Sequence, residues 1–389
     1  MKKNLTILIS LISFANFAQT KIDSIQFDAQ KQQNAAQRIL SGNFASQVTI
    51  GGYGEINYNQ PEGKNGELNV ERMVLLIGYN FDERTQFVTE LEYEDTGDEI
   101  TVEQAFINYN VANNISLRGG LMLVPMGIIN EYHEPTTFNG VNRPLVDRFI
   151  VPTTWREIGV GVTGRFNNLS LGYQAYIFNG FRSVNKDTLG FIGGETGLRG
   201  GRQKGIQSTI DSPNLSVKFD YYGIPGLRLG LSGYFGRTQA DDEIENLDGA
   251  DVGISMVGFD ARYTKDRFAA RGEFIYTSLT DTEDFNTLTG KDLGSAMLGW
   301  YTEASYNLLP MTKRQKLFAF ARYSEYNTHL QTDGSLAENP AFDRNDLTFG
   351  LSYHIAQGVV VKGDYQIFDN DVANIDSTKQ LNFGLGFWF

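Results

Sequence analysis

Histidine is the side chain best suited to acid–base and metal chemistry near neutral pH, and the chain has only three. His133 stands between two carboxylates in the segment Glu131-Tyr132-His133-Glu134-Pro135, whereas His354 follows Ser352 by two residues in an alternating stretch. A spacing of two on a strand places both side chains on one face, as a serine hydrolase would require. Such an enzyme also needs an oriented base and an oxyanion site, and the sequence signals neither. We therefore expect no enzyme activity.

A second set of chemically capable residues stands in one long segment, residues 124–156, which contains four prolines. Where a long loop narrows a channel, the charged side chains of the loop select among the ions that pass. The candidate constriction residues are Arg143, Arg148, His133, Glu131, Glu134 and Asp147. Salt bridges that pin the segment to itself or to a wall are an equal alternative for Arg143 and Arg148.

Three other patterns do not indicate sites. Residues 159–164 match G-x-G-x-x-G, but they lie in an alternating stretch, whereas a dinucleotide site needs a strand, a turn and a helix start. The acidic runs at residues 241–245 and 281–284 lack the spacing of a calcium loop. Solvated loops explain these runs better than bridges to lipopolysaccharide phosphates through divalent ions.

The elements that carry these residues are predicted to be strands. The last ten residues, 380–389, alternate large apolar with small or polar side chains and end on Phe389. Alternation places the apolar side chains on one face of a strand. About sixteen segments of this character, each roughly ten residues long, follow one another from about residue 46, which is the length that a tilted strand needs to cross a bilayer.

The connections between these segments alternate strictly between short turns and long polar loops, such as residues 124–156 and 179–213. An even number of strands with short turns at one rim and long loops at the other is typical of a transmembrane antiparallel β-barrel. The short turns would face the periplasm. A soluble all-β protein is the alternative, because short alternating strands alone do not exclude it.

Aromatic residues on the apolar stripes fall at the predicted strand ends, as in the aromatic belts of membrane proteins. The belt residues are Tyr79, Tyr109, Phe166, Tyr221, Tyr263 and Tyr306 at the short-turn rim, and Tyr58, Tyr93, Phe235 and Tyr276 at the long-loop rim.

The opposite face of the strands is polar, and barrels of about sixteen strands are wide enough to hold an aqueous channel. We therefore expect its charged residues to be solvated pore walls. The predicted basic residues are Arg72, Arg118, Arg165, Lys218, Arg228, Arg262, Arg271, Arg322 and Lys362. The predicted acidic residues are Glu55, Glu90, Glu92, Glu157, Asp220, Asp260, Glu273, Glu303 and Asp364.

The N-terminus predicts export. Lys2 and Lys3 precede a short apolar run and small residues, which suits a signal peptide over residues 1–18. Residues 19–45 would form a short periplasmic segment, with a helix over residues 30–40, and residues 46–389 the barrel. The chain has no cysteine, so disulfides cannot stabilise it, and its net charge of −13 argues against a nucleic-acid partner.

Three parts of the long segment carry a family resemblance. The start Val124-Pro125-Met126-Gly127, the His133-Glu134-Pro135 segment and the exit at residues 152–159, Pro-Thr-Thr-Trp-Arg-Glu-Ile-Gly, resemble Gram-negative outer-membrane porins related to the phosphate-selective porin O and P family. The resemblance implies a homotrimeric diffusion channel whose third loop narrows the pore, with Arg143 and Arg148 at the constriction. The predicted lumen residues carry positive and negative charges in about equal number. They therefore depart from the dense arginine ladder that is expected of a phosphate-selective pore.

We therefore expect a passive outer-membrane porin for small hydrophilic solutes or inorganic ions, with anions such as phosphate as one alternative. Its partners would be outer-membrane lipid and lipopolysaccharide, and no cofactor or metal is expected. The competing interpretation is a non-conducting outer-membrane barrel that acts as a hydrolase or as a structural anchor, with the third loop filling the lumen. In either interpretation, folding of residues 124–156 back into the lumen would bury Phe138, Val141, Leu145 and Phe149 against the wall.

Overall fold

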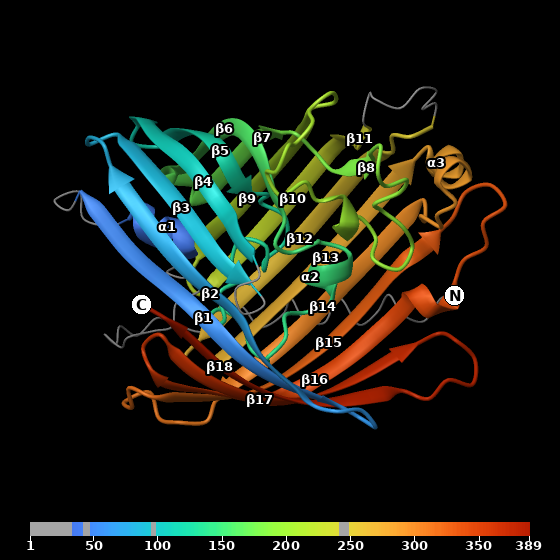
Figure 1. The fold of residues 1–389 in the computed structure, drawn as a ribbon. Coiled ribbons are helices and arrows are strands. Elements are labelled where there is room, and N and C mark those ends of the chain that lie inside the picture. Colours follow the sequence, from blue (N-terminus) through green and yellow to red (C-terminus); the bar gives the residue numbers. More distant parts are fainter. Residues whose placement is uncertain (1–32, 42–46, 95–98, 241–248) are drawn as a thin grey trace.

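The computed structural model describes residues 33–41, 47–94, 99–240 and 249–389, and their strands close into a barrel (Figure 1). The predicted signal peptide, most of residues 19–45 and the acidic run at residues 241–245 lie outside the described residues. The barrel has sixteen antiparallel strands, as predicted, in the order β1-β18-β17-β16-β15-β14-β13-β12-β10-β9-β7-β6-β5-β4-β3-β2.

The barrel strands have these bounds: β1 Val48–Pro61, β2 Glu67–Asn80, β3 Thr85–Glu94, β4 Glu99–Ala112, β5 Ile115–Leu123, β6 Arg156–Phe166, β7 Leu171–Phe178, β9 Asn214–Ile224, β10 Leu227–Arg237, β12 Gly253–Lys265, β13 Phe268–Thr280, β14 Ala296–Asn307, β15 Lys316–Gln331, β16 Asp343–Ala356, β17 Val359–Asn370 and β18 Thr378–Trp388. Several are longer than predicted; β15, for instance, runs five residues beyond its predicted end at Tyr326.

The final strand shows why this sequence forms a barrel. On β18, Leu381, Phe383 and Leu385 are 40%, 50% and 37% exposed, while Asn382 is fully buried. The apolar face therefore points outward, as a strand in contact with lipid requires. β18 pairs with β1, with Tyr53 opposite Trp388, and this pairing closes the barrel and removes both sheet edges.

The connections sort onto two rims, as predicted. Turns such as residues 81–84 and 225–226 lie at one end, the short-turn rim, and long loops lie at the other end, the long-loop rim. We call residues 124–155 loop L3 and residues 179–213 loop L4. Smaller elements that the sequence did not predict lie toward the long-loop rim: helix α3, Thr282–Thr289, and a two-stranded parallel sheet of β8, Arg182–Val184, and β11, Gln239–Ala240 (Figure 1).

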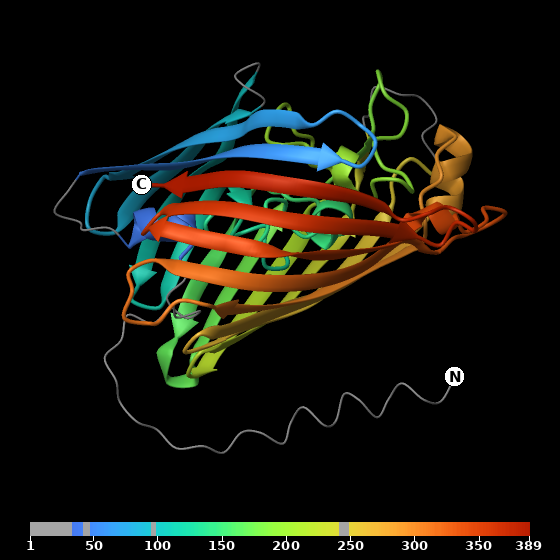
Figure 2. The same cartoon turned by 90° about the horizontal axis from the view of Figure 1, so that it is seen from below.

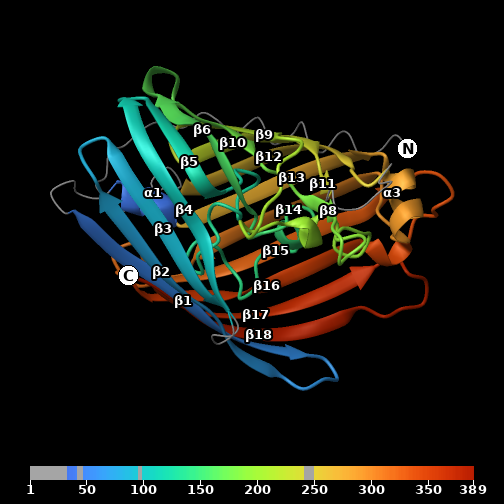
Figure 3. The same cartoon turned by 45° about the horizontal axis from the view of Figure 1, so that its top comes forward.

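The inside of the barrel is filled. L3, with the short helix α2, Val146–Phe149, coils within the ring of strands, and L4 lies beside it toward the long-loop rim (Figure 3). Apolar side chains of both loops form one buried cluster with wall residues. The expectation of solvated pore walls was therefore wrong for most of the lumen: Lys218, Arg322 and Glu90 are 0–1% exposed.

A short helix, α1, Ala35–Leu40, lies at the short-turn end near the chain's C-terminus (Figure 2). Asn34 caps it, with its side chain accepting from the Gln37 amide. Ile39 packs toward Gly78 of β2, and the Arg38 guanidinium lies 4.0 Å above the Trp388 ring. The helix begins later than predicted. Among the described residues, we find no helix with the length and apolar character that crossing a bilayer would take.

Candidate functional site

L3 is tied at its base by Asn130, which is fully buried. The Asn130 amide nitrogen donates to the carbonyls of Val124 at 2.7 Å and Trp155 at 2.9 Å, and its oxygen accepts from the Trp155 amide at 2.7 Å. The first and last residues of the loop are thereby joined through one side chain. This clamp fixes where L3 leaves the wall.

An aromatic layer covers the base of L3 from the L4 side. The Trp155 ring stacks on Phe181 of L4 and meets Tyr234 of β10 edge-on, both at 4.6 Å between centroids. The Trp155 indole donates to Glu157 at 2.8 Å, and the Tyr234 hydroxyl donates to the same carboxylate at 3.0 Å. All four side chains are at most 1% exposed. Water is excluded from this part of the lumen.

Polar groups hold the first part of L3 against the wall at β7, β9 and β13. Lys218 donates to the Gly127 carbonyl at 2.6 Å and to Glu131 at 2.9 Å, while Gln174 donates to the other Glu131 oxygen at 2.9 Å. Glu273 accepts from the Ile128 amide at 2.5 Å. Glu131, a predicted constriction residue, is thus an anchor of the loop.

The opposite wall holds the middle of L3. Arg322 of β15 donates to the carbonyls of Asn139 and Asn142 at 3.4 and 3.3 Å, and the Asn139 side chain donates to Glu303 at 3.0 Å. Asp364 of β17 accepts from the Val141 amide at 2.6 Å. L3 therefore crosses the lumen and is fixed on both sides.

The two predicted constriction arginines lie apart. Arg143 is partly buried and donates to the His133 carbonyl at 3.4 Å, within the loop itself. Arg148, on α2, is exposed, with its guanidinium 5.5 Å from the centre of the Phe149 ring. Among the described residues neither forms an ion pair, so the salt-bridge alternative is not what holds the loop.

Two acidic residues of L3 are buried in a way that disfavours their charge. Burial raises the pKa of Asp147 to about 7, although Arg271 and Arg322 oppose the shift. Burial likewise raises the pKa of Glu134, against the effect of His133 and Arg38. Neither side chain is more than 1% exposed. Both shifts favour the protonated, uncharged form of these two carboxyl groups.

The remaining constriction candidate, His133, lies in a buried cluster with Tyr53, Glu90 and Glu103. The imidazole Nε2 is 3.3 Å from Glu103 Oε2 and 3.7 Å from Glu90 Oε1, and Nδ1 is 3.0 Å from the Asn130 carbonyl. The Tyr53 hydroxyl donates to Glu90 at 2.6 Å and is 2.9 Å from Nε2. Burial lowers the pKa of His133, but the two carboxylates outweigh it and raise the value to about 10.

The structure places the predicted wall charges on the lumen side, but it pairs many of them. Arg72 contacts Glu55 at 2.7 Å, Arg228 contacts Asp220 at 2.9 Å and Arg271 contacts Glu303 at 2.9 Å. The residues placed inside the barrel wall and buried are Arg72, Lys218, Arg262, Arg322, Lys362, Glu55, Glu90, Glu92, Glu157, Asp220, Asp260, Glu273, Glu303 and Asp364. Arg118, Arg228 and Arg271 are half-buried, and Arg165 is exposed at the short-turn rim.

Glu103 was missed because the alternation fails beside it. The β3–β4 register shifts between Glu90 and Leu91, and on β4 both Glu103 and Gln104 point inward, being 0% and 5% exposed. A β-bulge adds one residue and redirects a side chain in this way. Tyr53 and Asn130 were missed for another reason: their partners lie in other elements, which local periodicity cannot show.

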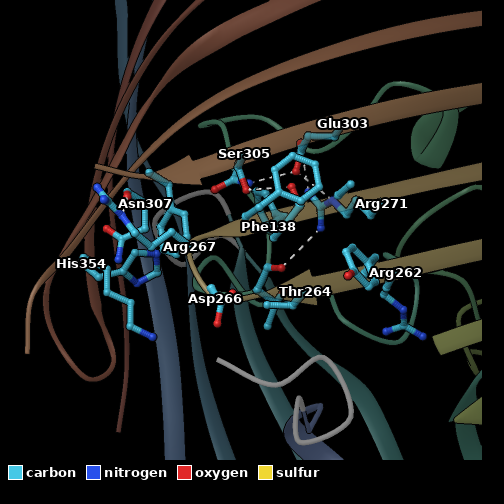
Figure 4. Close-up of a pocket in the computed structure, with 18 of the residues that line it drawn as sticks. Phe138, Arg262, Thr264, Asp266, Arg267, Arg271, Glu303, Ser305, Asn307 and His354 are labelled. Atoms are coloured by element: carbon cyan, nitrogen blue, oxygen red, sulfur yellow. Dashed lines mark hydrogen bonds and ion pairs between the residues drawn. The ribbon is translucent and has the colours of Figure 1, made fainter. Parts of the chain in front are cut away.

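Two cavities lie among the described residues in the half of the lumen nearer the short-turn rim. One lies between L3 and the strands β12 to β16; in Figure 4, Phe138, Arg271, Glu303 and Ser305 gather on one side of it and His354 lies on the other. The second lies between α1, L3 and the strands β4 to β10, and includes Arg118 and Arg228. The first cavity has a volume of about 80 Å³ and the second a volume of about 330 Å³.

Basic residues outnumber acidic ones in both cavities. The first has four basic and two acidic residues: Arg262, Arg267, Arg271, Lys316, Asp266 and Glu303. The second has three and two: Arg118, Arg165, Arg228, Glu131 and Asp220. Among the described residues, His354 borders the first cavity but hydrogen-bonds no carboxylate, and the Ser352 hydroxyl has no hydrogen-bond partner, so the hydrolase arrangement is not assembled.

No family model matches the sequence. A protein of Aquifex aeolicus (strain VF5), described as "Uncharacterized protein", is 30% identical over 351 residues, which span 82% of this chain and 75% of that protein. The two proteins belong to one family. The description of the relative names no activity, so the family assigns no function to the site.

Solved outer-membrane proteins share the fold. They include an anion-selective porin from Comamonas acidovorans (TM-score 0.60, 12% identity, 88% of this chain and 99% of that one). They also include OmpT of Vibrio cholerae in a structure described as the trimer form (0.57, 12%, 88% and 99%) and the outer membrane channel DcaP of Acinetobacter baumannii (0.57, 11%, 88% and 97%). At such low identities, the structural similarity establishes the architecture alone, which is a porin-like, closed sixteen-stranded barrel.

Proposed function

We propose that the protein is a passive channel of the Gram-negative outer membrane for small hydrophilic solutes and inorganic ions, with a bias toward anions. The observation that carries the proposal is the placement of L3. It crosses the lumen, is held by wall residues on both sides, and leaves two cavities beside it that are lined by charged residues and large enough for several water molecules. A loop in this position narrows a wide barrel to a selective passage. No reaction follows from the arrangement, and we expect no enzyme activity.

The anion bias rests on the excess of basic side chains in both cavities. Clefts lined by one sign of charge raise the local concentration of the opposite ion. Phosphate specificity, which the resemblance to the porin O and P family suggests, would need basic groups that are free of carboxylates. Most wall arginines are instead paired, so we favour a modest preference over specificity. We also propose that the protein forms a homotrimer, as the same resemblance implies.

A non-conducting barrel is the second candidate, and one observation favours it. The aromatic layer of Trp155, Phe181 and Tyr234 is fully buried and joins L3 to L4 and to the wall at β10. A packed apolar layer without water does not conduct ions. In this case L3 and L4 would close the lumen and the barrel would serve as an anchor.

A liposome-swelling assay with purified, folded protein separates the two candidates. The channel proposal predicts swelling in isotonic solutions of small uncharged sugars, with rates that fall steeply as the sugar grows, and faster uptake of a small anion than of a cation of equal size. An anchor predicts no swelling above that of empty liposomes. Chemical cross-linking in detergent tests the trimer, which fails if only monomers are captured.

A further inference from the structure

The cluster of Glu90, Glu103 and His133 joins two wall strands to the first half of L3. Glu90 lies on β3, Glu103 lies on the neighbouring β4, and His133 belongs to the loop. One potential ligand atom of each residue lies within 4.8 Å of the other two, and all three side chains are at most 1% exposed. We propose that these three side chains bind a divalent transition-metal ion such as Zn²⁺, with the Tyr53 hydroxyl beside it.

The orientation of the imidazole fits a metal ligand. Nδ1 is 3.0 Å from the Asn130 carbonyl, so in a neutral ring Nδ1 carries the proton and Nε2 presents its lone pair to the carboxylates. A hydrogen bond from the far nitrogen to a carbonyl is the usual support of a metal-bound histidine. Asn130 itself is fixed by the clamp at the base of L3, so the ring is held in place before an ion arrives.

The spacing of the ligand atoms also fits. Atoms about 2.0–2.2 Å from a tetrahedral zinc ion lie roughly 3.3–3.6 Å from one another. Nε2 is 3.3 Å from Glu103 Oε2 and 3.7 Å from Glu90 Oε1. The Tyr53 hydroxyl, 2.6 Å from Glu90 and 2.9 Å from Nε2, would move outward slightly to become a fourth oxygen ligand.

The charges and unused oxygens of the cluster call for a cation. Within the described residues, His133 is the only charged partner within 4 Å of Glu90 or Glu103. Arg72 contacts Glu55 and Glu92, and it acts on Glu103, as Arg156 does, only from a greater distance. Metal binding at Nε2 would displace the proton that the imidazole otherwise carries there, and the two carboxylates with the neutral imidazole then carry a charge that a divalent ion cancels. Glu103 Oε1 is buried and accepts no hydrogen bond, which bidentate coordination would remedy.

Glu134, the next residue along, supplies an independent observation. It is 0% exposed, neither carboxylate oxygen receives a hydrogen bond from another residue, and it interacts electrostatically with His133, Arg38 and Glu90. A buried carboxylate without donors points to a missing positive charge nearby. The metal would tie L3 to β3 and β4, whether or not the barrel conducts.

Metal content tests the proposal directly. We would refold untagged protein with Zn²⁺, remove unbound ion, and measure zinc by mass spectrometry together with the thermal midpoint in the presence and absence of a chelator. The site predicts about one zinc per chain, a midpoint that falls on chelation, and at least a tenfold loss of zinc in H133N and E103Q. The control H354A, which removes a histidine outside the cluster, should retain zinc.

Two results would overturn the proposal. Wild-type protein that is folded but holds no zinc would mean that a proton on His133 Nε2 fills the gap between the carboxylates. Equal zinc in wild type and H133N would mean binding elsewhere. Should H133N fail to fold, anomalous scattering from wild-type crystals grown with Zn²⁺ decides the matter, because the proposal requires a peak between Nε2 and the two carboxylates.

Discussion

Asn130 and Trp155 bind each other in both directions across the base of L3. The Trp155 amide donates to the Asn130 side-chain oxygen at 2.7 Å, and the Asn130 side-chain nitrogen donates to the Trp155 carbonyl at 2.9 Å. The two residues are 25 positions apart in the sequence. This reciprocal pair converts a long connection into a closed unit that can keep one shape inside the barrel.

Asn130→Ala should therefore destabilise the protein more than a typical surface substitution. It removes three hydrogen bonds and leaves the buried Trp155 amide without an acceptor, whereas the Val124 and Trp155 carbonyls keep the Met126 and Val124 amides as donors; the loss costs on the order of 3 kcal/mol. We expect L3 to become susceptible to protease in the folded barrel. Limited proteolysis followed by mass spectrometry would show cleavage within residues 124–155. An unchanged pattern would mean that the wall contacts alone hold the loop.

Lys218 and Glu131 should be coupled energetically. Lys218 is fully buried and contacts Glu131 at 2.9 Å, so Lys218→Met leaves a buried carboxylate without its cation, at a cost of roughly 3–5 kcal/mol. The double variant K218M/E131Q should recover part of this loss. A double-mutant cycle of urea unfolding in detergent measures the coupling, and additive effects would contradict it.

The aromatic layer should limit conduction. Phe181→Ala removes the ring that stacks on Trp155 and opens the contact between L4 and L3. We expect larger current steps than in wild type, along with a lower unfolding free energy, by about 3–5 kcal/mol. The control is Phe383→Ala, which changes a side chain on the outer face. Equal conductance in wild type and F181A would show that the layer does not lie on the route of the ions.

Asp147 should make stability depend on pH. Its pKa of about 7 in the folded protein lies above the ordinary carboxyl value of about 3.9, so the folded state binds the proton more tightly than the unfolded state. The contribution is complete below about pH 4 and is lost as the pH rises through 7. Relative to D147N, wild-type protein should therefore lose stability between about pH 4 and pH 7. If the melting temperatures of wild type and D147N depended on pH in the same way over that range, the assignment would be refuted.

Arg118 should influence ion selectivity. It lines the larger cavity and, among the described residues, forms no ion pair, donating instead to Asn108 at 2.9 Å. Arg118→Glu should shift the reversal potential toward cations. Arg314→Gln, in an exposed turn at the same rim, should leave the potential unchanged. Equal shifts in both variants would point to surface charge in place of the cavity.

Local periodicity was enough to predict the barrel. The alternation of residues 380–389 predicts the lipid-facing stripe because successive side chains of a strand point to opposite faces, one toward lipid and one toward the lumen. The same rule failed at Glu103, where a bulge turns two neighbours inward. It also says nothing of what fills the lumen, since the contact of His133 with Tyr53, 80 residues away, depends on how L3 folds. The buried state of the wall charges therefore became visible only in the structure.

Single-channel recording in a planar bilayer under a KCl gradient tests the central claim most directly, because L3 and the cavities beside it define the proposed passage. We predict discrete current steps from wild-type protein, with a reversal potential displaced toward that of chloride. Folded protein that inserts into the bilayer yet gives no steps, either as wild type or as F181A, would contradict the channel and leave the closed barrel.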